Sequence, residues 1–450
     1  MRDENFAVDS TWISKWEPEN EEFWKSSGSR LAWVTLAITT LNLTMAFMAW
    51  FLVSALVVRL PQIGFQFSSN QLFWLAAMPG LAGGTLRLVH MFLTPMLGTK
   101  KVVALSTLSL LLPLVGWFYA VQDLSTPYWM LLTLAFLAGL GGGNFSSFMP
   151  STSLFFPKRL QGTALAIQAG IGNFGVSIVQ FVTPWIIGFA LLGGASFLGE
   201  SQVLSKGGVE SKVYLQNAAA VMIPLVVVFG ISAWIFLKSV PIKANFAQQF
   251  DIFNSRHTWS MTSLYIMTFG AFSGLAATFP LLIKQIYGGF EGAPDPLAWA
   301  FWGPLVGSAA RVAAGPLSDK FGGARVTHWA ALGMLLSTLW VTTLTHPNGL
   351  DSFPMFVTGM LVLFFFAGVG NASTFKQMPM LFDPRQAGGV IGFTGAIAAY
   401  GPFIFGMLFA SSFAAYKSAT PVFYALAAFF AFNLLLNWWM YARRGALNPC

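Results

Sequence analysis

The chain has 450 residues, of which 56% are hydrophobic and only 9% are charged, and its mean hydropathy is +0.66. A soluble domain carries about 25% charged residues, so this composition excludes a soluble globular protein and indicates a polytopic helical membrane protein. The net charge of +8 does not indicate nucleic-acid binding, because the basic residues stand in short loops between apolar stretches, where they report membrane topology.

The polar amino-terminal 30 residues lack the basic-then-apolar order of a cleavable signal peptide, so we expect the first membrane helix to direct insertion. Twelve apolar stretches follow, each long enough for a spanning helix, which needs about 20 residues. Two other stretches are polar enough to be loops, namely 191–212, rich in Gly and Ser, and 239–257, which joins the two halves. The apolar stretches are 31–58, 71–97, 101–121, 127–156, 162–190, 213–238, 258–287, 296–317, 325–346, 353–382, 387–413 and 418–442.

The distribution of Lys and Arg predicts that both termini are cytoplasmic. With that orientation the inner loops and tails hold 16 of these residues and the outer loops hold five, which leaves three of the 24 inside helices. An excess of basic residues on the inner side is what the positive-inside rule requires. The three basic residues inside helices are Arg87, Arg311 and Lys376.

One stretch occurs twice, about half the chain apart. Residues 78–102 align without a gap with residues 302–326, and the alignment pairs Arg87 with Arg311. Parallel repeats of this kind describe two six-helix halves related by an axis along the membrane normal. We therefore predict an all-α membrane protein with twelve transmembrane helices in two pseudo-symmetric six-helix bundles, the major facilitator fold. A second repeated motif pairs Gly143-Asn144 with Gly370-Asn371.

This organisation predicts five segments along the chain. They are a cytoplasmic amino-terminal tail (1–30), an N-terminal six-helix bundle (31–238), a cytoplasmic linker (239–257), a C-terminal six-helix bundle (258–442) and a cytoplasmic tail (443–450).

The two paired arginines are the strongest candidates for a binding site. A guanidinium in the hydrocarbon costs about 2.5–3.5 kcal/mol on insertion scales, so each needs a partner. One explanation is a structural pair with a carboxylate or helix carbonyls, but all 16 acidic residues lie in loops, tails or helix ends. Two equivalent arginines that face one cavity without an acid leave a charge of +2, and a small anion is the simplest occupant.

Glycine-rich helices and aromatic residues surround this position. The fifth helix contains Gly170, Gly172 and Asn173, and the eleventh contains a further glycine run from Gly392 to Gly401. Glycine permits close helix contact and bending, and packing alone explains such spacing as well. Asn173 could donate hydrogen bonds to an anion. Rings can sandwich a flat anion, and the candidates are Phe145, Tyr265 and Phe269.

These motifs resemble the nitrate/nitrite porter family of the major facilitators over essentially the whole chain. The resemblance rests on the fifth-helix run from Gly170 to Ser177, on Gly143-Asn-Phe-Ser-Ser, on the arginine pair and on the eleventh-helix glycines. The stretch from Gly315 to Arg325 also resembles the superfamily's short cytoplasmic loop signature, with Asp319 followed by Gly322 and a basic residue.

The resemblance implies a central site at which Arg87 and Arg311 clamp nitrate or nitrite. Phe145 and Phe269 would stack on the faces of the anion, and further contacts would come from Tyr265, Asn173, Gly170 and Gly172. It implies a monomeric carrier in the bacterial cytoplasmic membrane, with nitrate, nitrite and membrane lipid as partners and with no nucleic acid, metal or cofactor. Lys376 departs from the family pattern and is a candidate for proton coupling.

Three alternatives remain open. A monocarboxylate or another small anion also fits two arginines, and a membrane sensor without turnover is a different class of function. Proton symport competes with exchange, which we favour because no acidic residue lies in mid-helix and Arg does not deprotonate in proteins. An enzyme is not indicated, since the four histidines, including His90 near the site, are scattered.

Overall fold

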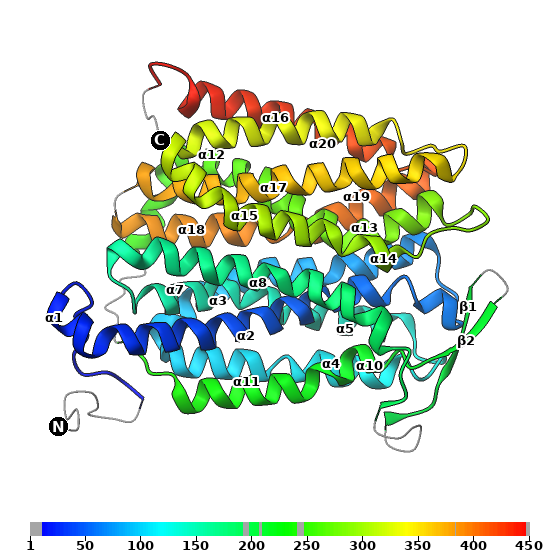
Figure 1. Cartoon of the computed structure of the whole chain (residues 1–450), viewed down its shortest axis with the longest axis horizontal. Coiled ribbons are helices and arrows are strands. Elements are labelled where there is room, and N and C mark those ends of the chain that lie inside the picture. Colours follow the sequence, from blue (N-terminus) through cyan, green and yellow to red (C-terminus); the bar gives the residue numbers. More distant parts are fainter. Residues whose placement is uncertain (1–10, 192–197, 207–208, 241–246, 383, 447–450) are drawn as a thin grey trace.

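The computed structural model describes residues 11–191, 198–206, 209–240, 247–382 and 384–446. Long helices run side by side between two ends of the molecule (Figure 1). Helix α1 and the last helical turn before residue 443 lie at one end, and the strands β1 and β2 lie at the other, which we call the hairpin end. The helices of the first half and of the second half occupy opposite sides of the molecule.

The first half begins with a continuous helix from Glu21 to Leu56, started by the side chain of Asn20, which accepts hydrogen bonds from the backbone N–H groups of Glu22 and Phe23. Its elements are α1 (Glu21–Phe23), η1 (Trp24–Gly28), α2 (Ser29–Leu56), η2 (Leu60–Ile63), α3 (Ser69–Leu108), α4 (Leu111–Ala120), α5 (Tyr128–Ala138), α6 (Leu140–Gly143), α7 (Phe145–Ser153), α8 (Lys158–Ile186), β1 (Gln202–Lys206), β2 (Val209–Val213), α10 (Asn217–Ala220) and α11 (Met222–Phe236).

The second half follows a short connecting helix, η4. Two of its spanning helices are interrupted, one by a π-helical turn in η5 and one by a break after α18. The elements are η4 (Ala247–Asn254), α12 (Arg256–Tyr265), η5 (Ile266–Gly270), α13 (Ala271–Tyr287), α14 (Pro296–Ala300), α15 (Trp302–Phe321), α16 (Gly323–Thr342), η6 (Leu350–Ser352), α17 (Phe353–Leu381), α18 (Pro384–Ala398), α19 (Gly401–Tyr416), α20 (Thr420–Asn437) and η7 (Trp438–Ala442).

Within the described residues, nine helical segments are long and apolar enough to cross a membrane. One of them, Ser69–Ala120, contains two of the predicted stretches. The predicted stretches 296–317 and 325–346 correspond to α15 and α16, which fall outside the nine. Twelve predicted spans therefore match the helices, and the predicted twelve-helix fold is confirmed.

Two glycines make the repeated sharp turns that follow the repeated arginines. Gly98 has φ 77° and ψ 160°, and Gly322, its partner in the sequence repeat, has φ 89° and ψ 136°. A side chain is strained at such positive φ values. A Cβ atom at Gly98 would also lie 2.5 Å from Ser239 Oγ. The glycines therefore allow the chain to reverse at equivalent positions in both halves.

Two predicted non-helical segments are more ordered than expected. Part of the predicted loop 191–212 forms an antiparallel hairpin in which Gln202 pairs with Val213 and Lys206 with Val209; residues 192–197 and 207–208 of that loop lie outside the described residues. The second half of the predicted tail packs on the first bundle, where Trp16 Nε1 donates to the carbonyl oxygen of Leu154 at 3.0 Å. Residues 1–10 of the tail lie outside the described part.

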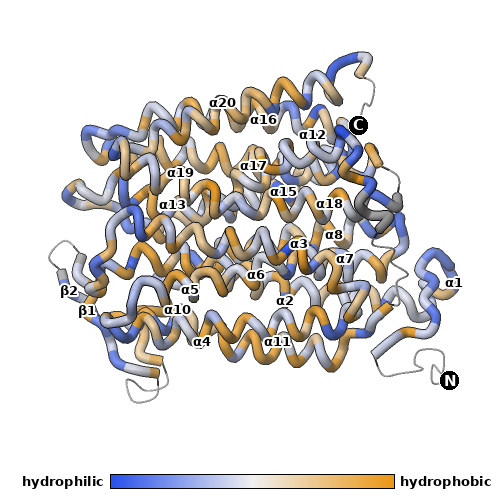
Figure 2. The backbone as a smooth tube through the Cα atoms, turned by 180° about the vertical axis from the view of Figure 1, so that it is seen from behind, coloured by the Kyte–Doolittle hydropathy of each residue, from blue (hydrophilic) through white to orange (hydrophobic). Residues whose placement is uncertain are grey.

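Hydropathy follows the layout of a membrane protein. Apolar residues cover the middle of the helices, and hydrophilic residues gather at the two ends (Figure 2). Large apolar side chains stay exposed along the helix flanks, as at Leu112 (63%) and Trp329 (65%). Exposed apolar surface of this extent is stable against lipid and not against water. The two halves meet through α3, which packs on α18 and α19, and through α8, which packs on α15.

Candidate anion-binding site

Arg87 lies at the junction of the two halves and is fully buried. It stands in α3 after Gly80, Ala82, Gly83 and Gly84, small residues that let neighbouring helices approach closely. Its Nε donates to the carbonyl oxygen of Gly142 in the first half, and its Nη1 donates to that of Gly395 in the second half, both at 2.8 Å. Its Nη2 has no hydrogen-bond partner, so one N–H edge of the guanidinium remains available.

Aromatic rings surround the Arg87 guanidinium. Its Cζ lies 4.6 Å from the ring centroid of Phe145, 5.1 Å from that of Phe269 and 5.4 Å from that of Trp50. The rings of Phe145 and Phe269 face each other with centroids 6.5 Å apart and planes inclined by 26°. A flat anion between two ring faces needs about 7 Å, so these predicted stacking residues are brought together and would have to part only slightly.

Arg311 lies in α15 and is 6% exposed. Its Cζ is 5.1 Å from the ring centroid of Phe375, and its Nη1 has no hydrogen-bond partner. The Phe375 ring is in turn 6.5 Å from that of Phe145 and 5.0 Å from that of Tyr265. A connected group of rings therefore joins the two arginines, as the repeat predicts for a shared central site.

A π-helical turn positions Tyr265 and Phe269. Tyr265 ends α12, and η5 inserts its wider turn directly after it; such turns inside helices are frequent at functional sites. The rings of the two residues stack with centroids 5.3 Å apart and planes within 7°. Both side chains are fully buried. The Tyr265 hydroxyl interacts with the Arg311 guanidinium, and because a hydroxyl both accepts and donates, it can still donate its proton to an anion.

The fifth-helix residues divide into one polar candidate and two packing residues. Asn173 is fully buried, and neither its Nδ2 nor its Oδ1 has a hydrogen-bond partner. A Cβ atom at Gly170 would lie 2.5 Å from Val312 in the second half, and one at Gly172 would lie 2.8 Å from Leu43. The two glycines thus hold neighbouring helices close, and their predicted contact with substrate stays a prediction.

Lys376 does not lie in the ring group. Its Nζ forms an ion pair of 2.5 Å with Asp319 Oδ1, and the two side chains are 42% and 65% exposed. The pair joins the last turn of α15 to the C-terminal part of α17. This position separates Lys376 from its neighbour Phe375, which faces the arginines. The coupling role suggested for Lys376 stays a prediction, and it would have to act at an exposed helix end.

The charge of the arginine pair is not balanced by nearby acids. Among the described residues, neither arginine has an acidic side chain within the ion-pair distance of 4.0 Å. A buried, unsatisfied N–H group costs about 1–3 kcal/mol, and more when the group is charged. A small anion that accepts hydrogen bonds from Nη2 of Arg87 and Nη1 of Arg311 would remove this cost.

Two ring residues were missing from the sequence prediction. Phe375 contacts Arg311, and Trp50 contacts Arg87 while its Nε1 donates to the Pro79 carbonyl oxygen at 2.8 Å. Phe375 follows the repeated Asn371 by four residues, one helical turn, which is a signal that could have found it. His90 is also close to the site, but its Nδ1 is engaged with Ser147 Oγ at 2.9 Å.

Comparison with known proteins places the chain in a family. Residues 36–347, more than half of the chain, match the Major Facilitator Superfamily model. The chain is 64% identical over 445 residues to a probable nitrate/nitrite antiporter of Thermus thermophilus, NarK2, with 99% of each chain covered. It is 36% identical to the nitrate/nitrite transporter NarU of Salmonella typhimurium, with 96% of each covered.

Solved structures agree on the fold alone. A bacterial homologue of the human lysosomal transporter Spinster, in an inward-facing and unoccupied conformation, matches with a TM-score of 0.63 and 14% identity, covering 90% of this chain and 93% of that one. The arginine pair, the helical repeat and these relationships together show that the chain belongs to the nitrate/nitrite porter family of the major facilitator superfamily.

Proposed function

We propose that this protein exchanges nitrate and nitrite across the bacterial cytoplasmic membrane by alternating access. The observation that carries the proposal is the pair of buried arginines, each with an N–H group that has no partner. Relatives that cover nearly the whole chain are named as nitrate/nitrite antiporters or transporters. Proteins of this fold bind substrate between their two halves, where Arg87 bonds to Gly142 and to Gly395.

In this proposal each site residue has a separate task. Arg87 and Arg311 bind the oxygens of the anion, because a planar guanidinium matches the paired oxygens of a planar anion. Phe145 and Phe269 enclose its faces, and the ring edges present positive potential. Tyr265 supplies a further donor. Additional contacts are proposed for Asn173, Gly170 and Gly172.

Exchange follows from the free-energy cost of enclosing the two arginines when no anion is bound. Arg does not deprotonate in proteins, so the empty carrier would have to enclose two positive charges as the halves rearrange, at a cost of several kcal/mol. A bound monoanion offsets part of this cost. The loaded carrier should therefore reorient quickly and the empty carrier slowly, which is the kinetic behaviour of an exchanger.

The orientation and organisation of the chain form part of the proposal. Both termini face the cytoplasm, so the hairpin end faces outward. The bundles comprise residues 31–238 and 258–442, joined by the linker 239–257, of which 241–246 lie outside the described residues, and flanked by tails 1–30 and 443–450. The protein works as a monomer in lipid, without nucleic acid and without a catalytic reaction.

Binding competition on the purified protein tests the substrate. Nitrate and nitrite should protect the protein against thermal unfolding and should displace each other, because a ligand that binds only the folded state stabilises it. Acetate and other small monocarboxylates should protect it far less, since acetate carries a methyl group where nitrate has its third oxygen and nitrite only a lone pair on nitrogen, and this group cannot accept a hydrogen bond from the second arginine. Equal or stronger protection by a monocarboxylate would favour the alternative, a carrier of another small anion.

A further inference from the structure

The hairpin end carries a charged contact between the two halves. Arg59 follows α2, and Asp295 ends the connection between α13 and α14 as the N-cap residue of α14. Arg59 Nη2 lies 2.9 Å from Asp295 Oδ1 and 2.7 Å from Oδ2. The Arg59 side chain is 5% exposed and that of Asp295 is 29% exposed. Burial of the Arg59 side chain makes the contact less subject to screening by salt than a fully exposed surface pair.

Neighbouring hydrogen bonds cross between the halves at the same end. Lys284 Nζ, at the end of α13, donates to the carbonyl oxygen of Val58 at 3.2 Å. Ser69 Oγ, at the start of α3, donates to Gln285 Oε1 at 2.9 Å. Each joins a residue of the first half to one of the second half. Separation of the halves at this end would break all of these bonds together with the Arg59–Asp295 pair.

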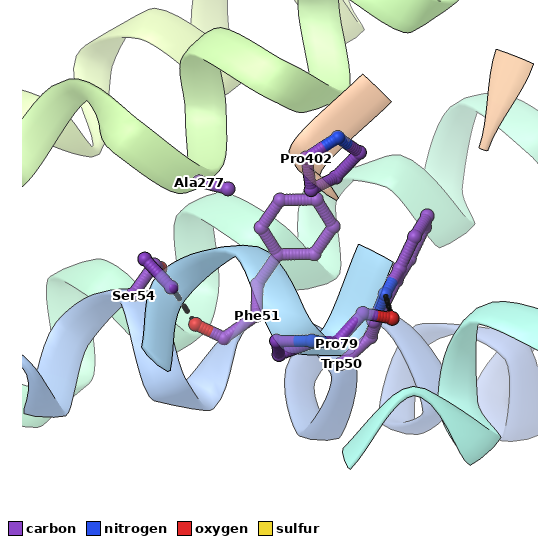
Figure 3. Close-up of a pocket in the computed structure, with 7 residues that line it drawn as sticks. Trp50, Phe51, Ser54, Pro79, Ala277 and Pro402 are labelled. Atoms are coloured by element: carbon purple, nitrogen blue, oxygen red, sulfur yellow. Dashed lines mark hydrogen bonds between the residues drawn. The ribbon is translucent and has the colours of Figure 1, made fainter. Parts of the chain in front are cut away.

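A second, apolar layer lies deeper, between the charged pair and the arginine site. Trp50, Phe51, Pro79 and Pro402 converge there, as Figure 3 shows, around a cavity of about 10 Å³. A cavity of this volume holds at most about one water molecule. Gln180 supports the layer, since its Nε2 donates to Ser54 Oγ and to the carbonyl oxygen of Ala276, both at 2.9 Å.

A large cavity lies next to the charged pair, on the side away from the arginine site. A cavity of about 820 Å³ is lined by Arg59, Lys284, Glu291 and Asp295 and by residues of the hairpin strands. The pair therefore borders a wide vestibule on its outer side and has the closed apolar layer on its inner side. An anion in the vestibule could not reach the arginine site unless both layers opened.

We propose that Arg59 and Asp295 form a latch that holds the hairpin end closed and sets how often it opens. The inference rests on the proposed function in one respect, because alternating access requires this end to open. Opening would expose both charges to water, where each is well solvated, whereas removing one partner in the closed state leaves the other charge largely buried and unpaired. Breaking the latch should therefore shift the population toward states that are open at the hairpin end.

Cysteine labelling in lipid nanodiscs tests the latch without measuring transport. Cys450 is the only cysteine in the sequence, so Cys450→Ser gives a cysteine-free parent. Ser54→Cys then places a reporter in the apolar layer, where Ser54 is 2% exposed. Asp295→Asn removes the charge and keeps an oxygen that can accept the bond from the Leu297 N–H, so the start of α14 is preserved. The matched control is Asp351→Asn, at an exposed acid in η6.

Asp295→Asn should speed maleimide labelling of the reporter by about fivefold or more, and Asp351→Asn should leave the rate unchanged. Arg59→Lys keeps the charge but loses the guanidinium, whose Nη2 contacts both Asp295 oxygens while its Nη1 donates to Gln62 Oε1 at 3.1 Å, and it should give a smaller acceleration. Arg59→Lys also tests the latch if Asp295→Asn does not fold. Labelling of a folded Asp295→Asn or Arg59→Lys protein at the parent rate would overturn the latch. Accelerated labelling of a protein that transports no anion would instead overturn the proposed function and leave the latch standing.

Discussion

A guanidinium and an ammonium carry the same charge, but they differ in hydrogen-bonding geometry. The planar guanidinium can donate to two oxygens at once through two N–H groups, and the ammonium cannot. Arg87 already uses Nε and Nη1 on two carbonyl oxygens and has Nη2 free. A lysine at this position would have one nitrogen for all of these partners. We predict that Arg87→Lys and Arg311→Lys each lower nitrate transport by about tenfold or more, with normal amounts in the membrane. Near-normal transport by both variants would remove the arginines from the mechanism.

Two substitutions of Phe269 distinguish a role in binding the anion from a role in packing. If the face of Phe269 contacts the anion, Phe269→Ala should weaken nitrate binding more than Phe269→Tyr, which keeps the ring. Titration calorimetry on both folded variants checks this. Because the ring also stacks on Tyr265 at 5.3 Å, Phe269→Ala will lower stability as well, so binding must be measured well below its unfolding temperature. Equal affinities of the two variants would assign Phe269 to packing.

At the scale of elements, close helix contact depends on glycines at particular positions. A Cβ atom at Gly368 in α17 would overlap the carbonyl oxygen of Gly307 in α15, whereas one at Gly315 would meet no atom within 4 Å. Gly368→Ala should therefore destabilise the protein by about 1–3 kcal/mol through overpacking. Gly315→Ala should be neutral or slightly stabilising. Thermal unfolding in detergent compares the two, and an equal midpoint for both would contradict the packing argument.

Sequence reasoning located elements whose signal is local. The apolar stretches and the glycine turns after Arg87 and Arg311 could be predicted because hydropathy and chain reversal depend on neighbouring residues. The hairpin was missed because its Gly- and Ser-rich composition hides short alternating strands. The π-helical turn η5 and the carbonyl partners of Arg87 could not be predicted, since a carbonyl oxygen has no signature in the sequence. The ion pair of Lys376 with Asp319 could not be predicted either, because the two residues are far apart in the sequence.

At the scale of the whole molecule, the two halves are held together in the middle and at the hairpin end. Arg87 bonds to the carbonyl oxygens of Gly142 and Gly395, one in each half, and Arg59 pairs with Asp295. An anion that binds Arg87 offers an alternative acceptor to the Gly395 carbonyl. Anion binding can thus weaken the hydrogen bond through which Arg87 holds the second half. This would let the loaded carrier rearrange faster than the empty one.

Nitrate uptake into liposomes tests the exchange proposal most directly. Vesicles reconstituted with the purified protein are loaded with nitrite, with nitrate or with buffer alone, and uptake is measured with and without an inward proton gradient. We predict rapid uptake when either anion is inside, slow uptake into anion-free vesicles, and little effect of the proton gradient. Lys376→Gln should leave exchange intact, because Lys376 is paired at an exposed helix end. Strong uptake into anion-free vesicles under the proton gradient, abolished by Lys376→Gln, would contradict exchange and establish proton symport.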